Sequence, residues 1–398
     1  MTPTAPDQSA RTSFGLIIAL WAAGLCAAAQ FAKVAVIFPE LLALYADAGS
    51  SAGFLLSLLS FLGMVLGLVA GILVATIGYR RLLLAALVLG SVVSAFQASL
   101  PSFGLMLASR LVEGGSHLVI VVAAPTLIAQ LSSNQHRAAA MTLWGTFFGV
   151  AFALVAWLGL PLVNSHGPAS LFAAHSAAMA LMAVILYVML PADKPQSASP
   201  GDSPLSPGAI LLRHARTYAS PFIAAPALGW LFYTLSFVSL LTILPETVAT
   251  DQRSFVIGAM PLATTAASMV LGVILLRHLK AITVVMIGFA AAFLCAILLW
   301  RMPGAPAVCL ALFAALGLVQ GASFSAVPEL NAAGNDRAYA NGALAQMGNL
   351  GNLSGTPILL WSMSALGFNG LILFALLCFA GGLLVHGWLA FRRAQVQR

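Results

Sequence analysis

Charged side chains are scarce in this sequence. They make up 7% of its 398 residues, whereas 61% are hydrophobic. A soluble domain carries roughly a quarter charged residues. With a mean hydropathy of +1.02, the chain has too little polar surface to cover itself in water. A soluble globular fold is therefore excluded, and lipid must be the main solvent of this protein.

Cysteine and catalytic motifs are scarce as well. The four cysteines lie inside apolar runs without a Cys-x-x-Cys pair, so we interpret them as inert thiols and expect neither a disulfide framework nor a metal site: Cys26, Cys295, Cys309 and Cys378. Paired intramembrane aspartates, a His-Glu-x-x-His motif and a phosphate-binding loop are all missing. The sequence thus predicts neither an enzyme nor an ATP-driven pump, and no cofactor.

Basic residues outnumber acidic ones by seventeen to ten, and they lie in short loops between apolar runs. No basic stripe with interleaved aromatic residues occurs, which argues against nucleic-acid binding. If both termini are cytoplasmic, thirteen of the seventeen basic residues fall in cytoplasmic segments. We therefore predict a multi-pass protein of a bacterial-type inner (plasma) membrane with both termini in the cytoplasm.

Twelve apolar runs are long enough to cross the hydrocarbon core, which takes about 20 helical residues. The first run continues past a stretch that imitates a signal-peptide cleavage site, Ala27-Ala28-Ala29, so we interpret it as an uncleaved span. The predicted helices cover about Phe14–Phe38, Ala52–Ile77, Leu82–Ala98, Phe103–Leu131, Ala138–Val163, Ala169–Leu190, Pro221–Leu244, Phe255–Leu276, Ala281–Trp300, Ala305–Val327, Tyr339–Leu366 and Gly370–Phe391.

The two sets of six are separated by a polar segment rich in Pro and Ser, from Pro191 to Pro204, which reads as a flexible linker. The sequence therefore predicts an all-α membrane protein with two pseudo-symmetric six-helix bundles. Its expected segments are a cytoplasmic N-terminal tail (1–13), an N-terminal bundle (14–190), a cytoplasmic linker (191–218), a C-terminal bundle (219–391) and a cytoplasmic tail (392–398).

A weak internal repeat supports two related halves. Leu111-Val112-Glu113-Gly114-Gly115-Ser116 in the fourth helix matches Leu318-Val319-Gln320-Gly321-Ala322-Ser323 in the tenth. Both segments occupy the same position in their half. Repeated halves with a site between them are typical of secondary transporters.

Four residues stand out in the loop between the second and third helices: Gly71, Gly78, Arg80 and Arg81. This pattern resembles the loop signature of the major facilitator superfamily, which helps to latch the two halves, although Ala75 stands where the family has Asp. In the fourth helix, Arg110 and Gly114 resemble the family's Arg-x-x-x-Gly motif, which is associated with proton coupling in exporters. The resemblance implies a monomer whose helices one, four, seven and ten line a central cavity.

Arg110, Glu113 and His117 form the most informative constellation, because their spacing places all three on one face of the fourth helix. Ionisable groups are costly inside a bilayer and imply a wet or protein-facing surface. We expect Glu113 to gain and lose a proton, Arg110 to control its charge, and His117 to relay the proton or to contact substrate. The alternative is a static Arg–Glu pair that locks two helices.

Lys33 lies in the first helix, where it can pair with Glu113, attract an anionic substrate or extend its ammonium to the headgroups. Gln30, one turn earlier, shares its face. Other candidates for the substrate cavity are an aromatic patch in helix seven and two amides in the polar helix eleven, with tight packing as the alternative: Trp230, Tyr233, Phe237, Asn349 and Asn352. The lone His175 and His386 are expected only to hydrogen-bond a neighbouring helix.

The leading hypothesis is a secondary transporter that works by alternating access, with proton-coupled export of a small organic compound first. Uptake of a small anion, as in cyanate- or nitrate-type members, is the runner-up and is motivated by Lys33 and Arg110. A non-transporting membrane receptor is the third. The expected partners are a small-molecule substrate, protons and the lipid bilayer.

Overall fold

The computed structural model describes residues 12–67, 77–133, 136, 140, 143–192, 207–331 and 334–396. Within these ranges the chain forms helices and no strand. In a bilayer every backbone N–H and C=O must find its partner inside the protein, and a helix achieves this locally. The predicted all-α class is therefore present.

The first half contains six spans, some of which are built from shorter helical pieces. A span from Ala46 to Gly67 begins with η1, α3 and η2, and another runs from α8 through a π-helical segment, η3, into α9. The elements are α1 (Phe14–Ala35), α2 (Phe38–Leu44), η1 (Ala46–Gly53), α3 (Phe54–Ser57), η2 (Leu58–Ser60), α5 (Tyr79–Gln97), α6 (Phe103–Leu131), α8 (Phe147–Leu154), η3 (Val155–Gly159), α9 (Leu160–His166) and α10 (Pro168–Met189).

The second half repeats this plan after the linker helix α11. The elements are α11 (Pro207–Ala219), α12 (Ala224–Ile243), η4 (Leu244–Thr247), α13 (Thr250–Ala267), η5 (Ser268–Gly272), α14 (Val273–Leu276), α15 (Ala281–Arg301), α16 (Pro306–Leu330), α17 (Gly334–Leu366) and α18 (Phe368–Val396). Residues 193 to 206 of the predicted linker lie outside the described residues.

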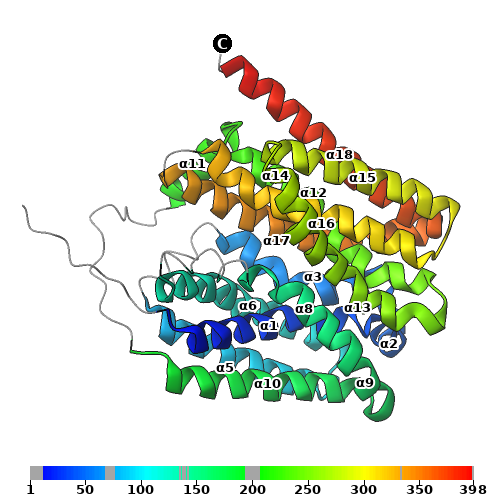
Figure 1. The fold of residues 1–398 in the computed structure, drawn as a ribbon. Helices are drawn as coiled ribbons and strands as arrows, with labels where there is room; N and C mark the ends of the chain where they lie inside the picture. Colours follow the sequence, from blue (N-terminus) through cyan, green and yellow to red (C-terminus); the bar gives the residue numbers. More distant parts are fainter. Residues whose placement is uncertain are drawn as a thin grey trace, which may run out of the picture.

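The helices form two bundles, seen in Figure 1 with α1 to α10 in the lower part and the C-terminal helices in the upper part, except that α13 reaches down beside α8. Two sets of contacts make up most of the join between the bundles. The long helix α17 packs along η1, α3 and η2, and α8 and η3 pack against α13. A smaller contact joins α1 to α12. The remaining helices of each bundle mainly form its own core.

Eleven spans in the described ranges are long and apolar enough to cross a membrane. The twelfth, α17, is less apolar but has 33 residues, which makes it about 50 Å long. It packs between α12 and the N-terminal bundle, which partly or fully buries Gln346, Asn349, Asn352 and Thr356. The twelve-helix prediction therefore holds, and the polarity of α17 reflects its place at the interface.

Two predicted helix ends in the first half were wrong. The sequence predicts a first helix that reaches Phe38, but α1 ends at Ala35. Pro39 has no backbone N–H to continue the helix and instead lies in the first turn of the separate short helix α2. The second span begins at Ala46 rather than Ala52, because a 3-10 segment precedes its α-helical part.

The end of the last helix was also wrong. The sequence predicts a last helix that ends at about Phe391, but α18 continues to Val396. Arg392 donates to the carbonyl oxygen of Ala219 at 3.3 Å, and Arg393 donates to that of Pro221 at 3.1 Å. These bonds hold the last turns of α18 over the C-terminal end of α11, where a helix favours positive charge.

Candidate functional site

The interior of the N-terminal bundle contains three charged side chains, Lys33 of α1 and Arg110 and Glu113 of α6, all 0% exposed. Lys33 Nζ lies 2.6 Å from Glu113 Oε1, and Arg110 Nη1 pairs with Glu113 Oε2. A buried charge is tolerated in the bilayer only when it is paired. We call these three residues the ionic cluster.

Neighbouring helices hold the ionic cluster in place. Arg110 Nε donates to the backbone oxygen of Leu55 in α3 at 2.7 Å. Gln97 of α5 donates through Nε2 to Glu113 Oε2 at 2.9 Å and to Ser109 Oγ at 3.0 Å. Oε1 therefore accepts from α1 and Oε2 from α5 and α6, and these bonds together fix the rotamer of Glu113.

Lys33 continues into a polar chain toward α10. Its Nζ donates to Ser94 Oγ at 2.6 Å, and Ser94 Oγ lies 2.7 Å from His175 Nδ1. His175 Nε2 lies 2.9 Å from the backbone oxygen of Cys26, which can only accept, so Nε2 carries the hydrogen. In a neutral imidazole Nδ1 is then the acceptor, and the Ser94 hydroxyl donates to it.

The charges of the ionic cluster do not balance. Two cations face one carboxylate, so with a neutral His175 the cluster carries one excess positive charge. The second guanidinium nitrogen of Arg110, Nη2, has no partner in the described part of the chain. All hydrogen-bond partners described above come from α1, α3, α5, α6 and α10. The cluster's hydrogen-bond partners are thus internal to the N-terminal bundle.

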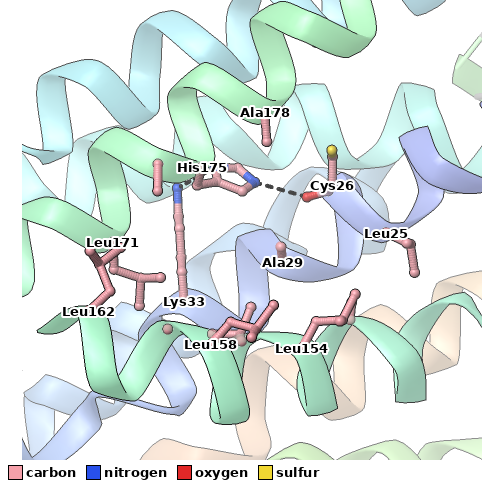
Figure 2. Close-up of a pocket in the computed structure, with 14 residues that line it drawn as sticks. Leu25, Cys26, Ala29, Lys33, Leu154, Leu158, Leu162, Leu171, His175 and Ala178 are labelled. Carbon is pink, nitrogen blue, oxygen red and sulfur yellow. Dashed lines mark hydrogen bonds between the residues drawn. The ribbon is translucent and has the colours of Figure 1, made fainter.

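A cavity of about 320 Å³ borders the ionic cluster between α1, η3, α9 and α10 (Figure 2). The stem of Lys33 and the ring of His175 form part of its wall, and the other lining residues are almost all leucine, alanine and valine. Leu154 and Leu158 at this cavity are 42% and 68% exposed on a membrane-spanning segment. The cavity is therefore apolar and opens toward the lipid-facing surface.

His117 lies apart from the other two members of the predicted constellation. Its Nδ1 donates to the backbone oxygen of Ala27 at 3.1 Å, and its ring meets Phe31 edge to face with centroids 5.1 Å apart. Arg110 and Glu113 point into the N-terminal bundle, whereas His117 faces aromatic side chains near the other bundle. The helical spacing placed them on one stripe, but their surroundings differ.

Trp230, Tyr233 and Phe237 of α12 form an aromatic stack, with ring centroids 4.3 and 5.1 Å apart. Phe237 reaches Phe148 of α8 at 6.2 Å, and Phe148 reaches Phe31 of α1 at 6.0 Å. The predicted aromatic patch therefore lies where the two bundles meet, in a row of rings that runs from one bundle into the other.

The predicted amides occupy three different surroundings. Gln30 lies inside the N-terminal bundle and donates to Ser116 Oγ at 2.9 Å. Asn349 donates to Ala345 of its own helix and packs directly on Gly63 of the second span. Asn352 has a buried side-chain oxygen without a partner among the described residues. Of the three, Asn349 lies at the contact between the bundles.

A profile of the Major Facilitator Superfamily matches residues 20–333, well over half of the chain. The chain belongs to the Major Facilitator Superfamily. It is therefore a multi-pass membrane transporter. A comparison with curated proteins found no match. Neither result identifies a substrate, so the chemistry of this major facilitator must be argued from its own residues.

The loop signature of this major facilitator is partly visible. Gly71 lies outside the described residues. Gly78 adopts φ 110°, a conformation that favours glycine, immediately before α5. Arg80 donates to the backbone oxygen of Tyr187 at 2.9 Å and lies over its ring, so this contact ties α5 to α10 of the same bundle.

Gln346 of α17 links both halves of this major facilitator to the linker helix. Its Nε2 donates to the backbone oxygen of Met64 at 3.2 Å and lies 3.0 Å from His214 Nε2. Its Oε1 accepts from Tyr218 at 2.8 Å. Burial raises the pKa of Tyr218 to about 12, so the phenol remains a donor at neutral pH. Through Gln346, these contacts join α17 to the second span and to the linker helix.

Sequence reasoning did not identify Ser94 and Gln97, which surround the ionic cluster. His175 was expected only to hydrogen-bond a neighbouring helix; it does so at Cys26 of α1, and its ring also lies next to Lys33. Ser94 and Gln97 are spaced by three in an apolar helix, which is a signal for a shared polar face. The family resemblance implies a cavity lined by helices one, four, seven and ten, which gave no reason to expect these partners. The third and sixth helices supply these side chains in this chain.

Proposed function

We propose that this transporter is a proton-coupled exporter of a small organic compound that works by alternating access. It acts as a monomer in the inner membrane, with both termini in the cytoplasm and with protons as the coupling ion. The observation that carries the proposal is the ionic cluster, because three ionisable groups are fully buried in one bundle with partners from that bundle alone.

The position of the ionic cluster favours proton exchange over substrate binding. A substrate would pass between the bundles, 14–190 and 219–391, as they rock about a central site. The cluster instead lies within the first bundle, and buried ionisable groups at membrane depth typically relay protons. The Arg110 motif adds the family's association with exporters.

The first and fourth spans connect the ionic cluster to the interface. α1 carries Lys33 on one face and Phe31 on another, and α6 carries Glu113 and, one turn further along, His117, whose ring contacts Phe31. Phe31 contacts Phe148, whose ring reaches the aromatic stack. A change of charge in the cluster can therefore shift α1 and α6 against the C-terminal bundle. The aromatic stack, Asn349 and Asn352 would face the substrate.

Proton release on adding candidate substrates to purified protein in detergent tests this proposal. The probes are a panel of lipophilic cations, siderophore-like chelators, sugars and small organic anions, each added to lightly buffered protein with a pH indicator. Lys33→Met is the informative variant, since it leaves Arg110 and Glu113 as a neutral pair. Lys280→Met, at an exposed lysine, is the matched control.

We expect one class of probe to release protons from the wild type and from Lys280→Met, and to release none from Lys33→Met. Equal release from all three proteins would show that the ionic cluster is structural. Binding of a probe to the wild type without any proton release would overturn proton coupling.

The excess positive charge favours a second candidate, uptake of a small anion. An anion that approached the cluster could balance this charge and bond Arg110 Nη2. Transport assays in proteoliposomes, with a potassium gradient that sets the membrane potential, distinguish the two functions. Uptake of labelled nitrate or cyanate that follows the membrane potential would favour anion uptake, whereas flux of a panel compound that follows an imposed pH gradient favours proton-coupled export.

A further inference from the structure

We propose that Lys33, rather than Glu113, is the group that gives up and regains the exchanged proton, and that Ser94 and His175 are its first acceptors. This inference rests on the proposed proton coupling and identifies the proton carrier within the ionic cluster. It differs from the sequence-based expectation, in which Glu113 takes that role.

The charge balance of the ionic cluster carries the argument. The charged or titratable side chains that face Lys33 are Glu113 and Arg110 from α6 and His175 from α10, while α5 presents the neutral Ser94. Protonation of Glu113 would leave two buried cations without a carboxylate, a net charge of two. Deprotonation of Lys33 leaves one neutral Arg110–Glu113 pair. Because buried charge is costly unless paired, the second change is the cheaper one.

The surroundings of Lys33 also suit both of its protonation states. As an ammonium it donates to Glu113 Oε1 at 2.6 Å and to Ser94 Oγ at 2.6 Å, and its Nζ lies 3.3 Å from His175 Nδ1, whose lone pair accepts from the Ser94 hydroxyl. As a neutral amine it keeps a donor for Glu113 and presents a lone pair to the Ser94 hydroxyl, which can rotate to donate. Glu113 has no such freedom, since Arg110, Lys33 and Gln97 all donate to it.

The orientation of the polar chain gives the proton a direction. His175 Nε2 donates to Cys26, so Nδ1 is free to accept. An N–H bond of Lys33 breaks as an O–H bond forms at Ser94, and the original Ser94 O–H bond breaks as an N–H bond forms at His175 Nδ1. Lys33 ends neutral and His175 ends as imidazolium, so one proton has moved and no other group has changed.

The chain is well suited to a direct test because it contains three lysines, Lys33, Lys194 and Lys280. Purified protein labelled with 13C at the lysine ε-carbon gives three NMR signals, which Lys194→Arg and Lys280→Arg assign by their loss. We expect the Lys33 signal to reach its neutral-amine shift at least about one pH unit below the other two. A Lys33 signal that titrates with the other two, or that stays charged until the protein unfolds, would overturn the proposal.

Two companion measurements separate the roles of the neighbours. With the glutamate δ-carbon labelled, the Glu113 signal should stay at its ionised shift from about pH 5 to about pH 9. A Glu113 signal that titrates in this window would restore Glu113 as the carrier. In His175→Gln, the Lys33 signal should still titrate, but charged and neutral signals should separate because proton exchange is slower. Unchanged exchange would remove His175 from the path.

These measurements need no substrate, so they fail independently of the proposed function. If the Lys33 signal titrates at lower pH than the other two lysine signals but no probe releases protons, Lys33 exchanges a proton in a transporter that does not couple protons to those probes. If a probe releases protons while Lys33 stays charged, proton coupling stands and the carrier lies elsewhere.

Discussion

The helices α6 and α16 are the fourth spans of the N-terminal and C-terminal bundles. In both, a glycine packs closely on a neighbouring element, but the residue one turn earlier differs. In α6, Gly114 lies directly on the backbone oxygen of Leu59. One turn earlier, Arg110 extends to the backbone oxygen of Leu55 and to Glu113.

In α16, Gly321 also packs closely on a neighbouring element, but the nearest atom is the side-chain hydroxyl of Ser268. One turn earlier, where the first bundle has Arg110, the repeat places Gly317, and any side chain there would collide with the backbone of Thr264. The position of Glu113 is taken by Gln320. The repeat thus conserves the close helix contact and replaces the buried ions with direct packing.

This difference indicates that two bundles of similar fold have different kinds of core. A glycine lets two helices touch, whereas an arginine needs room and an opposite charge. The first bundle therefore has an ionisable core that can change state. In the described part of the second bundle, the ion pair is Glu246–Arg253, whose side chains are 36% and 30% exposed near a span end. The second bundle instead contributes rings and close-packed backbone to the interface.

Loss of the buried carboxylate should be the most damaging change. Glu113→Gln leaves Arg110 without a carboxylate even if Lys33 is neutral, so we expect a loss of about 3–5 kcal/mol in stability. Thermal unfolding of purified protein in detergent measures this. Glu329→Gln is the control in the other bundle, where an exposed carboxylate accepts the Ala281 N–H at 2.8 Å and should contribute about 0.3–1 kcal/mol. Similar losses for the two variants would contradict the contrast between the bundles.

A methyl group at the two matching glycines should have unequal effects. Gly114→Ala meets the backbone oxygen of Leu59, which cannot move without its helix, so we expect a loss of about 1–3 kcal/mol. Gly321→Ala meets first the hydroxyl of Ser268, which can rotate, and should cost less. Thermal unfolding of both variants in the same detergent tests which substitution causes the larger loss of stability. A larger loss at Gly321 would show that the second contact is the tighter one.

The ring contact across the bundles should appear as an energetic coupling. A double-mutant cycle with Phe148→Ala and Phe237→Ala should give about 0.5–1.5 kcal/mol beyond additivity, because the two rings touch. The matched control pairs Phe148→Ala with Phe289→Ala, which lies within the second bundle and should be additive within about 0.5 kcal/mol. Additive effects in both cycles would mean that these rings do not couple the bundles.

The exposed ion pair should matter least. Arg253→Gln removes the partner of Glu246, 3.0 Å away, but both side chains are partly solvated. We expect a loss below about 1 kcal/mol that shrinks further with added salt. Unfolding midpoints at low and high salt test this, and a loss that is large and independent of salt would place this pair among the buried ones.

Much of the fold could be predicted because hydropathy acts locally. Apolar runs of sufficient length must be helical in lipid, so the spans and the two halves followed from the order of residues alone. Errors arose where a local event set the boundary, as at Pro39, or where a distant contact extended a helix, as at Arg392 and Arg393. The sequence predicts the polar helix α17 because small and apolar residues surround its amides.

The sequence by itself determined that Arg110 and Glu113 share a helix face, since helical spacing alone places them there. Only the tertiary structure decided what that face meets. Lys33 contacts Glu113, which lies eighty positions away in the chain, and His175 contacts Lys33 across a still longer separation. Both contacts form because α1, α5, α6 and α10 pack together. Periodicity specifies which side of a helix a residue occupies, but the neighbour on that side depends on packing between segments that are remote in sequence. The excess charge that carries the proposed chemistry is a property of that packing.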